Sequence, residues 1–287
     1  MSESLFCISS ELSAVGRESK GAWRGSLRGL LAGLPRSPAR LRHGKEHVEV
    51  SLLAEQLSCE LRVEYDLRRG RLPARARMEG HELRRGLVGV RCESVDEVIA
   101  GIESGRPVIA RLPLAAEVRG VVIVGVPDAV LFLESKPVLL MSLRAMAGRL
   151  EPSRSEVAAV KIYAFLMEEM GFDCSSLEVA VVRLLRVSVD RAWELGLHRL
   201  VAQAYASKRS LKILSQHPRL RAYLYGYSRA EVVRDVLRAL EYWRGEREPE
   251  PTDDPRACGS CPYVERCEAL RASAADQRPG GPAGSSR

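Results

Sequence analysis

Apolar residues at helical spacing divide much of the chain into predicted helices. In residues 155–172 (SEVAAVKIYAFLMEEMGF), Val157, Val160, Ala164 and Met167 recur every three or four positions, and Gly171 follows as a stop signal. Three further segments are interpreted as helices in the same way: residues 51–70 (SLLAEQLSCELRVEYDLRRG), 78–87 (MEGHELRRGL) and 95–104 (VDEVIAGIES). The stretch from about 190 to 247 is also expected to be mostly helical.

Dense apolar runs bounded by turn residues predict strands between these helices. Three runs in the middle of the chain have this character, and a fourth follows the long helix. They are residues 107–114 (PVIARLPL), 118–133 (VRGVVIVGVPDAVLFL), 137–146 (PVLLMSLRAM) and 177–187 (LEVAVVRLLRV). The order helix, strands, helix, strand predicts an α/β protein with a mixed sheet and helices packed on it.

The two ends of the chain differ in composition from its centre. Residues 1–46 are rich in Gly, Ser, Pro and Arg, and we expect a poorly ordered basic extension with at most one short helix. Residues 272–287 (ASAADQRPGGPAGSSR) have the composition of a flexible tail. The folded domain is therefore expected over residues 47–271.

The net charge of +7 favours polyanionic partners such as DNA. Only six of the 44 basic residues are lysines, and arginine suits bidentate phosphate recognition, although a GC-rich genome produces the same bias. No run of 18 apolar residues occurs and the start of the chain does not resemble a signal peptide, so we expect a cytoplasmic protein that does not enter a membrane.

Three of the seven cysteines form a compact array near the C-terminal end. Cys258, Cys261 and Cys267 follow the spacing C-x2-C-x5-C, which in an intracellular chain indicates metal binding rather than disulfides. Cys59 is the best candidate for a fourth ligand. Four thiolates suit either zinc or a [4Fe–4S] cluster, and the spacing leaves both open. The isolated Cys7, Cys92 and Cys174 are interpreted as core or incidental residues.

The segment VPDAVLFLESK contains the letters of a metal-dependent nuclease site: Asp128 followed by Glu134 and Lys136. In an extended strand, however, six residues place Glu134 roughly 20 Å from Asp128, too far for one shared ion. The polar ESKP reads as a hairpin turn at Ser135–Lys136. The residues facing Asp128 across that hairpin then lie near position 143, within Ser142-Leu143-Arg144.

Taken together, the motifs resemble the RecB-like CRISPR-associated exonucleases of the Cas four type. The resemblance covers roughly residues 48–270 and rests on the order of five elements. These are the first cysteine region around Cys59, a helical histidine motif (EGHELRRG, with His81), a Gly-x-x-Asp strand (GVPDAVLF, with Asp128), the helix KIYAFLMEEMGFD, and the C-terminal cysteine block.

The resemblance implies a PD-(D/E)XK nuclease core in which a [4Fe–4S] cluster held by Cys59, Cys258, Cys261 and Cys267 joins the N-terminal helix to the C-terminal region. It favours iron–sulfur over zinc. Members of this family cut DNA with manganese or magnesium and work with CRISPR adaptation proteins. The metal ligands retained here would be His81 and Asp128.

Three positions of the family's active site depart from its pattern in this chain. Where the family has an acid-x-Lys, this chain has Ser142 and Arg144, and Ala159 stands where the family has a Gln four residues before the retained Tyr163. Ser142 adds no negative charge, and the guanidinium of Arg144 stays protonated and cannot act as a base. The resemblance therefore implies a nuclease-like site with impaired or absent cleavage.

Three functions follow as hypotheses. The favoured one is a DNA-binding, iron–sulfur homologue of these exonucleases with a degenerate nuclease site and a role in CRISPR adaptation or DNA processing. An oligomeric state is compatible with this hypothesis. The alternative is an active metal-dependent single-strand DNA exonuclease or endonuclease. A zinc-stabilised regulatory protein is the third.

Overall fold

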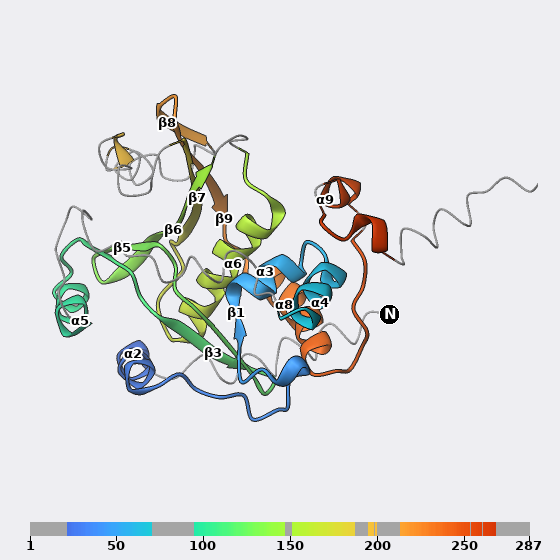
Figure 1. Cartoon of the computed structure of the whole chain (residues 1–287). Coiled ribbons are helices and arrows are strands. Elements are labelled where there is room, and N and C mark those ends of the chain that lie inside the picture. The colour runs from blue at the N-terminus through green and yellow to red at the C-terminus, as the bar shows by residue number, and fades with distance from the viewer. Residues whose placement is uncertain are drawn as a thin grey trace, which may run out of the picture.

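Figure 1 shows the fold in a computed structural model, which describes residues 22–70, 95–146, 151–186, 195–197, 199, 213–252, 254–259 and 261–267. The predicted helix over residues 78–87, with His81, lies outside the described residues. The helices are α2 (Ala22–Ala32), α3 (Val50–Gln56), α4 (Glu60–Arg68), α5 (Val95–Glu103), α6 (Arg154–Glu169), α8 (Arg229–Trp243) and α9 (Pro255–Cys258), with 3-10 turns η1 (Arg42–Gly44) and η3 (Val264–Arg266). The strands are β1 (Val48–Glu49), β2 (Val108–Ala110), β3 (Leu114–Val118), β4 (Val121–Gly125), β5 (Ala129–Leu133), β6 (Lys136–Met146), β7 (Glu178–Leu185), β8 (Ile213–His217) and β9 (Leu220–Gly226).

The strands form two sheets. The larger has the order β2-β5-β6-β7-β9-β8, with β6 and β7 parallel and the other neighbours antiparallel. The smaller has the order β1-β4-β3, with β1 parallel to β4. Helices α3, α6 and α8 lie beside the sheets in Figure 1. The predicted α/β class with a mixed sheet and flanking helices is confirmed, although the central strands divide between two sheets instead of one.

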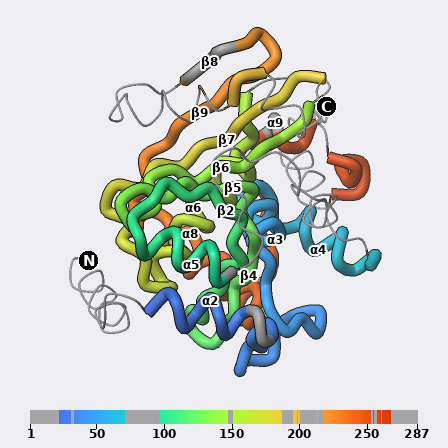
Figure 2. The backbone as a smooth tube through the Cα atoms, turned by 90° about the vertical axis from the view of Figure 1, so that its left-hand side faces the viewer, coloured from blue at the N-terminus to red at the C-terminus, as the bar shows by residue number. Residues whose placement is uncertain are grey.

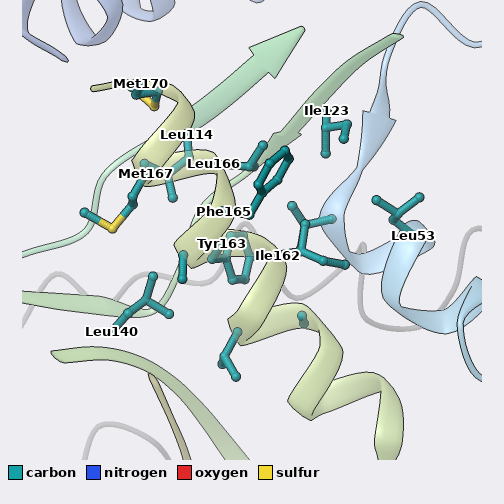
Figure 3. Packing of buried hydrophobic residues seen from close by; sticks show 14 of the residues in the cluster. Leu53, Leu114, Ile123, Leu140, Ile162, Tyr163, Phe165, Leu166, Met167 and Met170 are labelled. Atoms are coloured by element: carbon teal, nitrogen blue, oxygen red, sulfur yellow. The ribbon is translucent and has the colours of Figure 1, made fainter. Parts of the chain in front are cut away.

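Helix α6 is the centre of the larger apolar core. Figure 3 shows Ile162, Phe165 and Leu166 of this helix among Leu53 of α3 and Ile123 of β4. A capping box between Ser153 and Glu156 fixes its start, and Gly171, with φ of 92°, follows its end, as the stop signal predicts. The opposite face of the larger sheet buries a second cluster that includes Leu139, Met141 and Leu143 of β6 and Leu184 of β7.

The predicted helix over residues 51–70 is two helices. Helix α3 ends at Gln56, and α4 begins at Glu60 after a short turn. Cys59 occupies the N-cap of α4 with extended backbone angles, φ −168° and ψ 111°, which interrupt the helical hydrogen-bond ladder. The break places Cys59 at the entrance of a helix instead of inside one.

Residues 22–46 differ from the expected poorly ordered extension. Trp23 and Leu27 of α2 are buried, and the indole of Trp23 stacks on Phe172 with ring centroids 5.0 Å apart. Arg24 pairs with Glu103 of α5 at 2.6 Å, and Figure 2 shows α2 and α5 as neighbours. The Gly- and Arg-rich composition of this segment gave no indication that Trp23 and Leu27 lie on one buried helix face. Their burial makes this segment part of the domain.

The expectation of mostly helical structure from 190 to 247 is wrong for its middle part. Strands β8 and β9 form an antiparallel hairpin, and only α8 is a long helix in the described part of that stretch. The alternation of Leu220, Ala222 and Leu224, whose side chains enter the second core cluster, is a strand pattern. Pro218 lies in the turn that joins the two strands.

None of the helices that the structure describes is long and apolar enough to cross a membrane.

A buried carboxylate links η1, α4 and α8. Glu64 is 4% exposed and accepts hydrogen bonds from the hydroxyl of Tyr242 at 2.5 Å and from Arg68 Nε at 2.5 Å, and it lies 2.9 Å from His43 Nε2. Burial alone raises the pKa of Glu64, but the hydrogen bonds from Tyr242, His43 and Arg68 outweigh it and leave that pKa below its ordinary value of 4.5. Glu64 therefore stays ionised inside the domain.

We expect Glu64→Gln to lower the free energy of unfolding by roughly 1–3 kcal/mol at neutral pH, because the charge-assisted hydrogen bonds are lost. A lowered folded pKa gives stability that is present above pH 4.5 and lost as the pH falls through the folded pKa. The difference in thermal midpoint between wild type and variant should therefore be constant from pH 7 to 5.5 and shrink below pH 4.5. Glu231→Gln is the control, because Glu231 is 57% exposed. A difference between wild type and Glu64→Gln that does not change with pH contradicts the account.

Candidate functional site

Asp128 lies at the start of the β5–β6 hairpin. The hairpin turns at Glu134 and Ser135, whose φ values of 50° and 67° belong to the left-handed region of a two-residue hairpin loop. Ala129 pairs with Met141, so Asp128, one residue earlier, stands opposite Ser142. The predicted hairpin is confirmed, with its turn one residue earlier than expected.

One carboxylate oxygen of Asp128 accepts three hydrogen bonds from β6. Oδ2 receives the hydroxyl of Ser142 at 3.0 Å, the backbone N–H of Leu143 at 2.7 Å and Nη1 of Arg144 at 3.1 Å. The side chains of Asp128 and Arg144 are each 21% exposed, so the ion pair is largely shielded from water. The structure thus brings together Asp128, Ser142 and Arg144, as the hairpin geometry predicts. The negative charge that a nuclease would present to a metal ion is neutralised here by a guanidinium.

Lys136 and Glu134 belong to the hairpin tip and not to the Asp128 site. Lys136 Nζ pairs with Asp173 Oδ2 at 2.7 Å, and both side chains are half exposed. The hydrogen bond from Lys136 is the main cause that lowers the pKa of Asp173 to about 2, with help from Ser175. Glu134 is an exposed turn residue. The literal Asp-Glu-x-Lys reading of VPDAVLFLESK is therefore excluded by position.

Tyr163 and Ala159 lie on α6 within the apolar core. The ring of Tyr163, 4% exposed, occupies the space that a side chain at Gly125 would need: a Cβ there would lie 2.6 Å from Tyr163 Cε1. Gly125 is three residues before Asp128, so this contact holds the strand that leads to the site. Ala159 is 6% exposed and contributes only a methyl group.

A second ion pair, between Arg183 and Glu156, is buried near the Asp128 site and was not predicted from the sequence. Arg144 pairs in register with Arg183 of the parallel strand β7, so the two arginines share one face of the sheet. Arg183 Nη2 lies 3.0 Å from Glu156 Oε2, and the two side chains are 4% and 1% exposed. An arginine within the apolar run VVRLL, together with the Ser-x-x-Glu spacing of the capping box, is the signal that could have found this pair.

The predicted cysteine ligands come from two distant parts of the chain that pack on each other. Tyr263, in the cysteine loop, is 2% exposed and donates its hydroxyl to Asp66 of α4 at 2.5 Å. Its ring lies 5.2 Å from that of Tyr65. This contact docks the loop beside the helix that Cys59 caps, and the segment carrying α9 and η3 runs next to α4 in Figure 1.

The thiol of Cys258 lies near the other three predicted ligands. The pKa of Cys258 is raised first by burial and then by Cys59, Cys261 and Cys267. All four are partly buried free thiols. Among the described residues, no group of three or more His, Cys, Asp or Glu side chains is arranged to hold a metal ion. The donor chemistry suits a cluster, and the thiols are neighbours that do not converge on one point.

The remaining predicted ligand, His81, and Arg84 and Arg85 of the same predicted helix lie outside the described residues. Arg62 of α4 is half exposed, with Nη1 4.0 Å from Glu55. Cys174 is separate from the cysteine loop, and burial is the first cause that raises the pKa of its thiol.

No family model matches the chain, and no curated protein matches it. A solved structure described as "Crystal structure of SSO0001" is similar over 87% of this chain and 95% of that one, with 16% identity and a TM-score of 0.40.

Proposed function

We propose that this protein is a DNA-binding homologue of the RecB-like CRISPR-associated exonucleases, with a PD-(D/E)XK core in which metal-dependent cleavage is impaired or absent. The observation that carries the proposal is the triple hydrogen bonding of Asp128 Oδ2 by Ser142, Leu143 and Arg144. A nuclease of this type needs carboxylates that converge on a divalent ion. In this chain the position of the second carboxylate is a serine, and the position of the lysine is an arginine paired with Asp128.

A divalent cation at Asp128 is disfavoured on electrostatic grounds. It would have to lie beside a guanidinium whose Nη1 is 3.1 Å from the same carboxylate. Two positive groups that share one carboxylate repel each other in a partly buried site. Arg144 also cannot accept the proton of an attacking water. Asp128 and the carbonyl of Leu143 both engage Nη1 of Arg144. We assign the N–H groups of Nη2 to a phosphate, so that the site binds DNA without cutting it.

We further propose that Cys59, Cys258, Cys261 and Cys267 hold a [4Fe–4S] cluster, with zinc as the alternative. The docking of Tyr263 on Asp66, next to the helix that Cys59 caps, supports this ligand set. When bound, the cluster supplies a covalent crosslink between α4 and the C-terminal loop, and no catalytic step depends on it. The resemblance further suggests CRISPR adaptation proteins as partners.

DNA binding should survive removal of divalent ions. We expect a labelled single-stranded oligonucleotide to bind equally well in EDTA and in manganese. The logarithm of its association constant should fall linearly with the logarithm of salt concentration, with a slope of about −2 to −4 for three to five neutralised phosphates. Arg144→Ala should make the slope less steep by about 0.7.

Fluorescence anisotropy at several salt concentrations measures this slope. Arg234→Ala is the matched control, because Arg234 is 76% exposed on α8 and pairs with Asp235. If no DNA binds even at low salt, the nucleic-acid role is wrong. If binding requires manganese and is followed by cleavage, the alternative of an active nuclease holds.

A further inference from the structure

A pocket lined by tyrosines lies where β7 begins and β9 ends. Its volume is about 580 Å³, within the range of sites that enclose a small molecule or a single nucleotide. Tyr223, Tyr225 and Tyr227 line it together with Leu177, Glu178 and Ile213. We call it the tyrosine pocket.

The tyrosine pocket and the Asp128 site share one face of the larger sheet. Ser142 pairs with Val181, and Val181 pairs with Tyr223, so Tyr223 lies in the same cross-strand row as Ser142. Two strand spacings separate them, about 10 Å. Side chains alternate along β9, so Arg221, Tyr223 and Tyr225 project to this same face.

A row of arginines runs next to the tyrosines. Arg144 pairs with Arg183, which pairs with Arg221, and so places three guanidinium-bearing positions side by side on β6, β7 and β9. Arg144 and Arg183 each pair with a carboxylate. Arg221 is partly exposed, and no ion pair joins it to another described residue. Arg221 therefore offers a positive charge directly beside the pocket.

This arrangement matches the chemistry of one nucleotide in a single strand. Aromatic rings stack on any base, and a neighbouring arginine neutralises a phosphate, which is how proteins hold unpaired strands. Ile213, 57% exposed at the start of β8, gives the pocket an apolar rim that a base can cover.

We propose that the tyrosine pocket receives one unstacked base of a single DNA strand and that Arg221 pairs with a neighbouring phosphate of that strand. The proposal rests on the proposed DNA-binding function and adds to it a defined subsite. It accounts for a strand that carries Arg221, Tyr223 and Tyr225 at alternate positions on one face. A base paired in a duplex cannot enter the pocket, so single strands should be preferred.

The experiment combines variants of Tyr225 with abasic scanning of the DNA. A short oligonucleotide is synthesised with a single abasic position moved along its length, and its affinity for the full-length protein is measured by anisotropy. In wild type, one abasic position should weaken binding roughly 5- to 150-fold, the range for loss of one base–aromatic stack. Tyr225→Leu should weaken binding of the intact oligonucleotide by a similar factor and abolish its sensitivity to that abasic position.

Tyr225→Phe is the matched control, because it keeps the ring and loses only the hydroxyl, and it should retain both affinity and abasic sensitivity. Ile213→Glu provides a second variant at an exposed position that does not depend on the core, and it should also lower affinity for single strands. If DNA binds but all abasic positions are equivalent and Tyr225→Leu behaves as wild type, the pocket proposal is overturned while the DNA-binding function stands. If no DNA binds to wild type, both are overturned.

Discussion

Replacing Ser142 by Glu together with Arg144 by Lys should create manganese-dependent cleavage of single-stranded DNA. According to the proposed function, the wild-type protein should cut poorly or not at all. The change supplies a second carboxylate opposite Asp128 and removes the guanidinium that neutralises it. A lysine in place of Arg144 can position or activate the attacking water. We expect a gain in cleavage rate on the order of 10²-fold, the size of effect seen for one well-placed electrostatic group.

The steric cost of this rebuilding is a separate matter. Ser142 is 1% exposed, so a glutamate must find space among buried neighbours. Ser142→Asp with Arg144→Lys is the smaller variant, and addition of Ala159→Gln restores the third altered position. Thermal midpoints of all variants show whether a lack of cleavage reflects loss of folding.

Two controls separate the rebuilt site from the literal motif. Asp128→Ala in the rebuilt protein should abolish cleavage, whereas Glu134→Ala with Lys136→Ala should leave it unchanged, because Lys136 pairs with Asp173 at the hairpin tip. Robust cutting by wild type that disappears when Glu134 and Lys136 are removed contradicts our placement of the site.

Cys261→Ser should remove the iron–sulfur cluster and strongly destabilise the domain. Cys59 and the C-terminal cysteines are about 200 residues apart, so a shared cluster closes a very long loop. By analogy with long-loop crosslinks, its loss should lower the free energy of unfolding by about 4 kcal/mol and the thermal midpoint by roughly 10 °C.

Iron content, visible absorbance and the thermal midpoint of anaerobically purified protein measure this effect. Cys174→Ser is the matched control, since Cys174 is apart from the other thiols, and it should retain iron. Protein with stoichiometric zinc and no iron contradicts the iron–sulfur assignment. Protein with neither metal, as stable as the Cys261→Ser variant, contradicts a structural cluster of any kind.

The parts of the fold that local pattern determines were predictable from the sequence. The period of α6, with its Gly171 stop, and the polar ESKP between two apolar runs each specify one local conformation. The position of the hairpin turn then predicted that Ser142 and Arg144 lie beside Asp128. In an antiparallel pair, the turn determines which residues of the two strands face each other.

Other features depend on tertiary contacts that no local pattern encodes. The burial of Trp23 requires Phe172, which is far away in the sequence. The helix break at Cys59 accompanies packing of the C-terminal loop on α4. The Arg183–Glu156 pair arises because a strand arginine meets a helix cap across the sheet face. In β9, by contrast, the alternation of Leu220, Ala222 and Leu224 is a local strand pattern within a segment that was predicted to be mostly helical.

The closure of the Asp128 site to divalent ions is the central claim, and manganese binding measures it most directly. Manganese is titrated into the protein, and electron paramagnetic resonance measures the free ion. Wild type should show no manganese-binding site of micromolar affinity that depends on Asp128. The same titration should show one such site in the protein rebuilt with Ser142→Glu and Arg144→Lys. Tight manganese binding by wild type that disappears in Asp128→Ala would contradict the claim, because it would mean that Arg144 leaves the carboxylate available to a metal ion.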